Sequence, residues 1–144
     1  MTNGLNFDTD DIASLALCAW KEARGEGAEG MTAVMYVVTH RACVWYKGSI
    51  HAAIYAKNQF TSMSVPNDRE FNLQPSPDDP QFAYCEAVAH DVLTDTQEVE
   101  DPTGGALYYA NLNEVTSGWF VEKIVNDPAN HPQTAVIGKQ TFFR

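Results

Sequence analysis

Basic residues are scarce in this sequence, and they do not cluster. Nine Lys and Arg stand against 19 Asp and Glu in 144 residues, so the formal net charge is −10. A nucleic-acid-binding domain needs a basic face, and an anionic membrane surface attracts basic segments. The composition therefore excludes a nucleic-acid partner, argues against a membrane-surface protein and favours a soluble one.

Long hydrophobic runs are also missing. No apolar stretch approaches the roughly 18 residues that a membrane-spanning helix needs. The first eleven residues hold three aspartates and no Lys or Arg, so they lack the basic n-region of a signal peptide. We therefore expect synthesis in the cytoplasm without membrane insertion, with another component supplying any route outward.

Cysteine and histidine are few and scattered. The three cysteines, Cys18, Cys43 and Cys85, form no CxxC pair, so the spacing indicates neither a disulfide framework nor a zinc site. The four histidines show no HExxH spacing. We expect all three cysteines to be small buried core residues in a reducing compartment, and we expect no metal site.

The composition is that of a folded domain, with 44% hydrophobic and 19% charged residues. We expect a single catalytic domain over residues 1–144, because domains usually run to about 100–200 residues. Apolar periodicity predicts an α+β fold, a mainly helical body with a small antiparallel sheet. The expected elements are helices over 8–24, 29–43, 50–56 and from 78 or 79, a loop over 62–80, a strand over 106–110, a helical segment over 119–125 and a strand or hairpin over 134–143 with its turn at 138–139.

The densest polar cluster, residues 21–27, falls where the first predicted helix ends in a Gly-rich turn. Glu22 lies at the edge of the apolar stripe of that helix, whereas Arg24 points to nearly the opposite side. The helix dipole and partial burial both disfavour the ionised carboxylate and raise its pKa, so the carboxyl can donate a proton to a glycosidic oxygen. Glu22 is therefore a candidate general acid. Glu26 is its rival, or else binds backbone groups of the turn.

Four separated segments of the sequence, which occur in the order expected for the family, resemble the spore-cortex-lytic enzyme and cell wall hydrolase family. Together they cover nearly the whole chain, and the ordered set is more specific than any one of them. The sequence departs from the family pattern at His40, where Asn is usual, and at Gln140, where His is common. The segments are Trp20–Gly27 followed by Glu29–Val34; Val38–Arg41; Gln59–Thr61; and Gly105–Asn111 followed by Trp119 and Ile137–Arg144.

The resemblance implies a lysozyme-like fold that cleaves bacterial peptidoglycan between N-acetylmuramic acid and N-acetylglucosamine, and Glu22 matches the family's catalytic Glu. Such enzymes often act as lytic transglycosylases. One carboxyl group serves first as acid and then as base, the muramic hydroxymethyl group is the internal nucleophile, and no metal or cofactor takes part. Ordinary hydrolysis stays open. It requires a second carboxylate about 5–9.5 Å away, for which the candidates are Glu26, Glu29, Asp68 and Glu70.

The candidates for substrate contact combine amide, hydroxyl, carboxylate and aromatic groups. Tyr108 and Tyr109 are neighbours on a predicted strand, so their side chains face opposite ways, and we expect one to line a cleft and the other to join the core. The remaining candidates offer hydrogen bonds to an acetamide or to the acid, or an aromatic platform for a sugar ring. The residues assigned to substrate binding are Glu26, Gln59, Thr61, Tyr108, Tyr109 and Trp119.

Several alternatives remain open from the sequence. A muramidase-type hydrolase would use the same fold, and a Cys/His amidase would need one cysteine beside a histidine. A non-enzymatic acidic binding or inhibitor protein would explain the charge directly, since that charge opposes binding to an anionic cell wall. The favoured context is a monomeric phage endolysin, made in the host cytoplasm and released by a holin to act on the wall in the periplasm.

Overall fold

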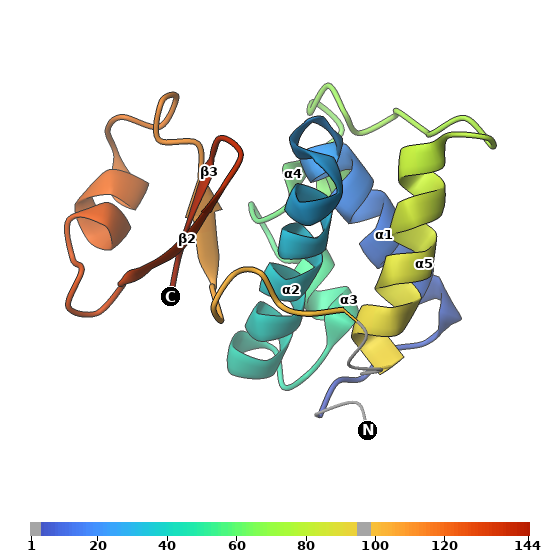
Figure 1. The fold of residues 1–144 in the computed structure, drawn as a ribbon, viewed down its shortest axis with the longest axis horizontal. Helices are drawn as coiled ribbons and strands as arrows, with labels where there is room; N and C mark the ends of the chain where they lie inside the picture. The colour runs from blue at the N-terminus through green and yellow to red at the C-terminus, as the bar shows by residue number, and fades with distance from the viewer. Residues whose placement is uncertain (1–3, 95–98) are drawn as a thin grey trace.

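Five helices form one side of the molecule, and a small sheet with a short helix forms the other (Figure 1). The computed structural model describes residues 4–94 and 99–144. This arrangement confirms the predicted α+β class. The elements are α1 (Thr9–Ala23), η1 (Arg24–Glu26), α2 (Gly27–Trp45), α3 (Ile50–Tyr55), α4 (Thr61–Ser64), α5 (Pro80–Thr94), β1 (Tyr108–Ala110), η2 (Val121–Val125), β2 (Gln133–Ile137) and β3 (Gln140–Phe143).

Helix α1 begins and ends where the sequence predicts. The Asp8 carboxylate accepts a hydrogen bond from the backbone N–H of Asp11, and the Asp11 carboxylate accepts one from the N–H of Asp8. This capping box satisfies two N–H groups that the first helical turn leaves unpaired. The chain leaves the helix through the 3-10 turn η1 and then Gly27, whose φ of +79° suits glycine. Glu22 therefore sits in the last turn of α1.

Helix α2 lies between the other helices and the sheet (Figure 1). Met31 and Met35 are buried in the core that α2 shares with α1 and α5. Ala33 and Val37 pack instead in a second cluster with Phe142 of β3. Apolar residues on both faces explain why the expected helix is central. Its C-terminal turns run along the junction between the helical body and the sheet.

The sheet has the strand order β1-β3-β2, and both pairings are antiparallel. The predicted C-terminal hairpin is confirmed, with Gly138 and Lys139 at the turn between β2 and β3. Tyr109 of β1 is paired with Phe142 of β3. This register carries β1 to the side of α2, where its side chains meet residues of the helical body.

Three expectations need correction. The loop predicted over 62–80 starts later, because residues 61–64 form α4 and bury Met63 under the body. The strand predicted over 106–110 is shorter, since only β1 makes the ladder. Cys43 is exposed, whereas Cys18 and Cys85 are buried as expected. Cys43 lies in the last turns of α2, next to Val44, which is also exposed.

Candidate active site

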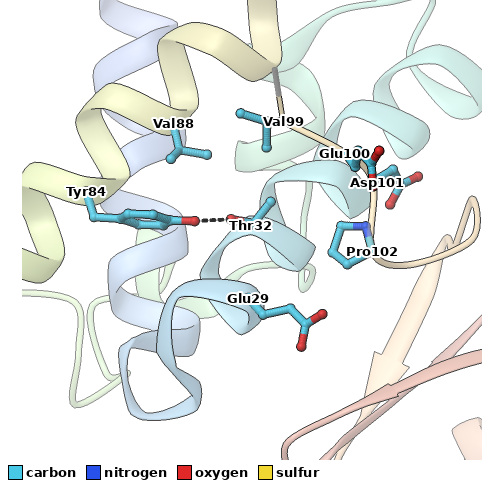
Figure 2. A pocket seen from close by; sticks show the side chains of 8 residues that line it. All are labelled: Glu29, Thr32, Tyr84, Val88, Val99, Glu100, Asp101 and Pro102. Carbon is cyan, nitrogen blue, oxygen red and sulfur yellow. Dashed lines mark hydrogen bonds between the residues drawn. The ribbon is translucent and has the colours of Figure 1, made fainter. Parts of the chain in front are cut away.

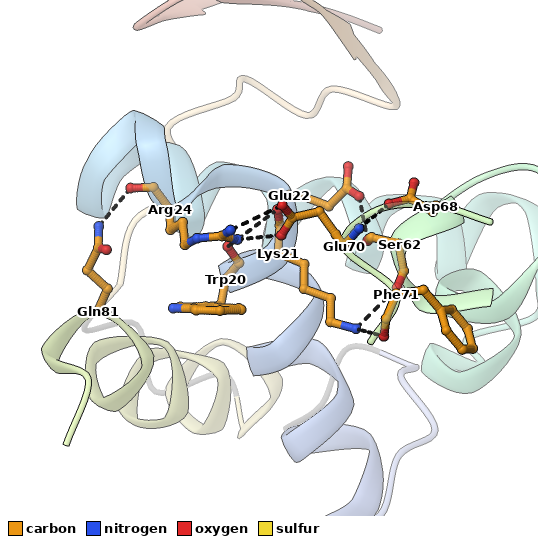
Figure 3. Close-up of polar contacts among 9 residues, drawn as sticks. All are labelled: Trp20, Lys21, Glu22, Arg24, Ser62, Asp68, Glu70, Phe71 and Gln81. Carbon is orange, nitrogen blue, oxygen red and sulfur yellow. Dashed lines mark hydrogen bonds and ion pairs between the residues drawn. The ribbon is translucent and has the colours of Figure 1, made fainter. Parts of the chain in front are cut away.

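Glu22 receives two hydrogen bonds from parts of the chain that are distant in sequence. The Ser62 hydroxyl of α4 donates to Oε2 at 2.7 Å, and the Tyr109 hydroxyl of β1 donates to Oε1 at 3.0 Å. Figure 3 shows Ser62 beside Glu22. Both donors are neutral, so they orient the carboxyl group without supplying a positive charge to hold it ionised.

The pKa of Glu22 is raised above the usual value for a glutamate, and burial is the main cause. The hydrogen bonds from Ser62 and Tyr109 lower it, the charge of Asp68 raises it, and the charge of Arg41 lowers it. The direction predicted from the sequence is therefore confirmed. A carboxyl group with a raised pKa retains a proton closer to neutral pH and can serve as a general acid.

The two hydroxyl groups should set the upper limit of the working pH. Each stabilises the ionised Glu22, so Ser62→Ala or Tyr109→Phe should raise the pKa of Glu22 further and move the basic limb of the kcat/KM profile to higher pH. Loss of one such bond is worth up to about one pH unit. The measurement is kcat/KM against pH. Ser64→Ala, in the same short helix, is the control that should leave the limb in place, and a limb that moves to lower pH would contradict this role of Glu22.

Asp68 is the second carboxylate that acts on the acid. It accepts hydrogen bonds from the Thr61 hydroxyl at 2.6 Å and from the Glu70 backbone N–H at 2.8 Å. These bonds lower the pKa of Asp68, whose charge in turn raises the pKa of Glu22. The two environments thus push the pKa values apart, as in acid and carboxylate pairs of glycosidases. The predicted hydrogen bond from Thr61 to Glu22 is therefore absent, because the Thr61 hydroxyl donates to Asp68.

Two basic residues of α1 and η1 hold the segment that carries Ser62 and Asp68 (Figure 3). Lys21 is buried and donates from Nζ to the carbonyl oxygens of Ser62 at 3.2 Å and Phe71 at 2.7 Å. Arg24 does not pair with Glu22, as predicted, and binds Glu70 through two hydrogen bonds of 2.7 and 3.2 Å. These contacts fix the long loop against the helix that presents the acid.

The other carboxylate candidates are committed elsewhere. Glu26 accepts a hydrogen bond from the backbone N–H of Lys139 at 3.3 Å, so it contacts the β2–β3 turn instead of its own Gly-rich turn. Glu70 is occupied by Arg24. Glu29 lines a different cavity. Of the four candidates, Asp68 is the one whose charge affects Glu22.

A groove of about 370 Å³ is connected to Glu22 through Tyr109, although Glu22 itself is not one of its lining residues. Tyr109 joins the groove to the surroundings of Glu22. Its hydroxyl donates a hydrogen bond to Glu22, while its side chain lines the groove and stacks on Phe142. Tyr108 lines the groove as well, with Trp119, which is 60% exposed. The groove is lined by Arg41, Trp45, Asn58, Gln59, Tyr108, Tyr109, Trp119 and Phe120. Aromatic faces together with amide groups are suited to a sugar that carries an acetamide.

Comparison with known proteins agrees with this arrangement. Residues 25–143 match the cell wall hydrolase family. The chain belongs to this family. It is 29% identical over 139 residues to a spore cortex-lytic enzyme of Oceanobacillus iheyensis, covering 96% of this chain and 43% of the relative. It is 29% identical over 137 residues to that of Bacillus subtilis, covering 94% and 38%. The chain thus spans less than half the length of these cell wall hydrolase relatives.

Two solved structures share the fold. The catalytic domain of the germination-specific lytic transglycosylase SleB from Bacillus anthracis is 26% identical, with a TM-score of 0.69, covering 96% of this chain and 98% of that one. The catalytic domain of the Bacillus cereus SleB protein is 27% identical, with a TM-score of 0.70, covering 100% and 98%. The lysozyme-like fold predicted for this cell wall hydrolase is therefore confirmed.

A second cavity of this cell wall hydrolase, about 600 Å³, shares no lining residue with the groove. Figure 2 shows it between α2, α5 and the segment after residue 99. Two of its lining residues, Thr32 and Tyr84, are joined by a hydrogen bond of 2.7 Å between their hydroxyl groups. Glu29, Glu100 and Asp101 also line it. Three carboxylates disfavour an anionic wall polymer, so the groove beside Glu22 is the better candidate for the substrate.

His40, which departs from the family pattern, has a structural partner. Its Nε2 lies 2.7 Å from a carboxylate oxygen of Asp101, and Thr103 also bonds Asp101. Burial raises the pKa of Asp101, but the hydrogen bonds from His40 and Thr103 outweigh it and lower that pKa to about 2. The pair ties the segment before the sheet to α2. Across the described ranges, 4–94 and 99–144, no group of three or more His, Cys, Asp or Glu is placed to hold a metal.

Two residues near the acid were not predicted from the sequence. Ser62 was assigned to a loop, although it directly follows the family-like segment Gln59–Thr61. Arg41 ends another such segment and is buried against the groove. Position in a matching segment for Arg41, and next to one for Ser62, was the available signal.

In the described parts of the chain, no helix is long and apolar enough to cross a membrane.

Proposed function

We propose that this cell wall hydrolase cleaves peptidoglycan between N-acetylmuramic acid and N-acetylglucosamine as a lytic transglycosylase, with Glu22 as acid and base. The observation that carries the proposal is the half-buried Glu22 carboxyl, which has a raised pKa and is oriented by Ser62 and Tyr109 at the side of a groove. The similarity to a solved lytic transglycosylase domain supports the same reaction.

The reaction balances with one proton that leaves and returns. Glu22 donates its proton to the glycosidic oxygen, and the bond from that oxygen to C1 of the muramic ring breaks. The hydroxyl on C6 of the same ring adds to C1 and closes a 1,6-anhydro ring, and its proton passes to Glu22. Asp68 stays ionised and adds negative charge near the site, which favours the positive charge that develops at C1.

The groove offers the sugar contacts that the sequence suggested. Tyr108 and Trp119 present aromatic faces, and Gln59 an amide, to its interior. We assign these three, with Tyr109, to substrate binding. Thr61 and Glu26 have other partners in the structure, and their contact with substrate stays a prediction.

The products distinguish the reaction from its alternatives. Purified peptidoglycan digested with the protein should yield 1,6-anhydro-muramic ends, identified by mass spectrometry of the fragments. New reducing ends would instead show a hydrolase, for which Asp68 is the second carboxylate. Freed peptides with intact glycan strands would contradict both and indicate an amidase. No release at all would favour a non-enzymatic binding protein.

The biological setting rests on the sequence alone. Action as a phage endolysin, release through a holin, the monomeric state and the extent of the single domain stay predictions. The thiol alternative has little support at Cys18 and Cys85, because burial raises the pKa of the Cys18 thiol well above its usual value and that of Cys85 to about 12. Thiolates, not thiols, are nucleophilic.

A further inference from the structure

Arg41 is a buried cation that faces no carboxylate partner within the described residues. Its side chain comes from α2 and lines the groove, and only 7% of the residue is exposed. Nε donates to the Leu107 carbonyl oxygen at 2.7 Å, and Nη1 donates to the Gln59 side-chain oxygen at 3.2 Å. A guanidinium has five N–H donors. The remaining donors therefore have no protein acceptor among the described residues.

Within the described residues, Arg41 forms no ion pair. The guanidinium lies 5.6 Å from the ring centre of Trp45 and 5.2 Å from that of Phe60. Aromatic faces attract a cation, but they carry no net charge. Burial lowers the pKa of Arg41, which reflects the cost of keeping the charge away from water. Glu22 is near enough for the charge of Arg41 to lower its pKa, but among the described residues the two side chains form no hydrogen bond or ion pair, and Glu22 accepts from Ser62 and Tyr109.

A buried charge without a counter-ion is costly in a folded protein. Such a charge at the wall of an open groove becomes favourable when a ligand brings the opposite charge. A guanidinium also matches the planar geometry of a carboxylate, which it binds through two parallel hydrogen bonds. The chain as a whole carries a net charge of −10, whereas the charged residue that lines this groove, Arg41, is positive.

We propose that the groove beside Glu22 is a carboxylate-binding site, in which Arg41 receives a carboxylate group of the peptidoglycan strand. The inference rests on the proposed function, because it names the part of the substrate that this same site recognises. Two parts of peptidoglycan carry the required group. One is the lactyl carboxylate of muramic acid without a peptide, and the other is the set of carboxylates on the stem peptide.

Kinetics on four substrates separate these sources. Glycan strands with free lactyl carboxylates and strands with intact stem peptides are each compared with the same strands after amidation by methylamine. Amidation of the recognised carboxylate should raise KM for the wild type at least about tenfold, with little change in kcat. Arg41→Gln should bind charged and amidated strands alike. Arg144→Gln, which removes an exposed guanidinium, is the matched control that should keep the wild-type preference.

Binding to the wild-type protein tests the site without cleavage and without a variant. N-acetylmuramic acid and muramyl dipeptide are titrated by calorimetry, each with its carboxylates free and as methyl esters. The free form of at least one should bind about tenfold more tightly or better. Equal binding within both pairs would overturn the carboxylate site, even if strands are cleaved at Glu22. If no strand is cleaved, the proposed function fails, and the titrations still decide whether the site exists.

Discussion

Replacing Glu22 with glutamine should abolish cell wall cleavage while the protein stays folded. Glutamine keeps the shape of the side chain and an oxygen for Ser62 or Tyr109, but it has no acidic proton to donate. Loss of the general acid should reduce the rate of release of peptidoglycan fragments by about 10²–10⁴-fold or more. Turbidity of a suspension of purified cell walls measures this rate.

The same substitution should stabilise the protein at neutral and alkaline pH. The pKa of Glu22 is raised in the folded protein, so the stability that this group contributes is fully present below its unfolded pKa and is lost as pH rises through its folded pKa. Glu22→Gln removes that loss. Its Tm should exceed the wild-type value at pH 8, and the difference should shrink at pH 4. Glu26→Gln is the matched control, and lysis by Glu22→Gln at the parent rate would refute the assignment of the acid.

Replacing Lys21 with methionine should cause the second large effect, a joint loss of stability and activity. Two buried or partly buried hydrogen bonds to carbonyl oxygens disappear, and the loop that holds Ser62 loses its anchor. Burial lowers the pKa of Lys21, so removal of the charge recovers part of this cost. We expect a net loss of about 2–4 kcal/mol and a Tm lower by roughly 5–15 °C.

Activity should fall further than the unfolded fraction explains, because Lys21 positions Ser62, which in turn orients Glu22. Lys21 itself acts without touching the substrate. The measurements are urea unfolding, kcat, and the pH profile at a temperature where the variant is folded. The basic limb should move to higher pH, in the same direction as for Ser62→Ala, since the hydrogen bond to Glu22 weakens. Lys57→Met, at an exposed lysine, should change none of these quantities. An unchanged pH profile for Lys21→Met would contradict the positioning role.

Local patterns were sufficient to predict the position of Glu22 and the elements that frame it. The capping residues Asp8 and Asp11 and the Gly-rich turn fix both ends of α1, which puts Glu22 in its last turn. Periodicity then places Glu22 beside the apolar stripe and predicts that Arg24 does not pair with it, and Arg24 indeed binds Glu70. The hairpin over residues 133–143 follows from strand propensity and a glycine turn. These features depend on neighbours in the sequence.

The partners of the acid depend on contacts that no local pattern encodes. Ser62 and Tyr109 meet Glu22 from 40 and 87 residues away. Met63 gives the polar segment at 61–64 the burial that makes it a helical turn instead of a loop. Cys43 is exposed in the last turns of α2, on a face of the helix that no local pattern marks as open to solvent. Each of these outcomes was decided by tertiary packing.

The pairing of β1 with β3 makes the hydrogen bond from Tyr109 to Glu22 depend on a strand far along the chain. Tyr109 is paired with Phe142 and stacks on its ring. A chain that stops before residue 142 lacks the residue that pairs with Tyr109 and stacks on its ring. Because the hydrogen bond from Tyr109 lowers the pKa of Glu22, loss of β3 should let the carboxyl keep its proton to higher pH, the same direction of change that we expect for Tyr109→Phe.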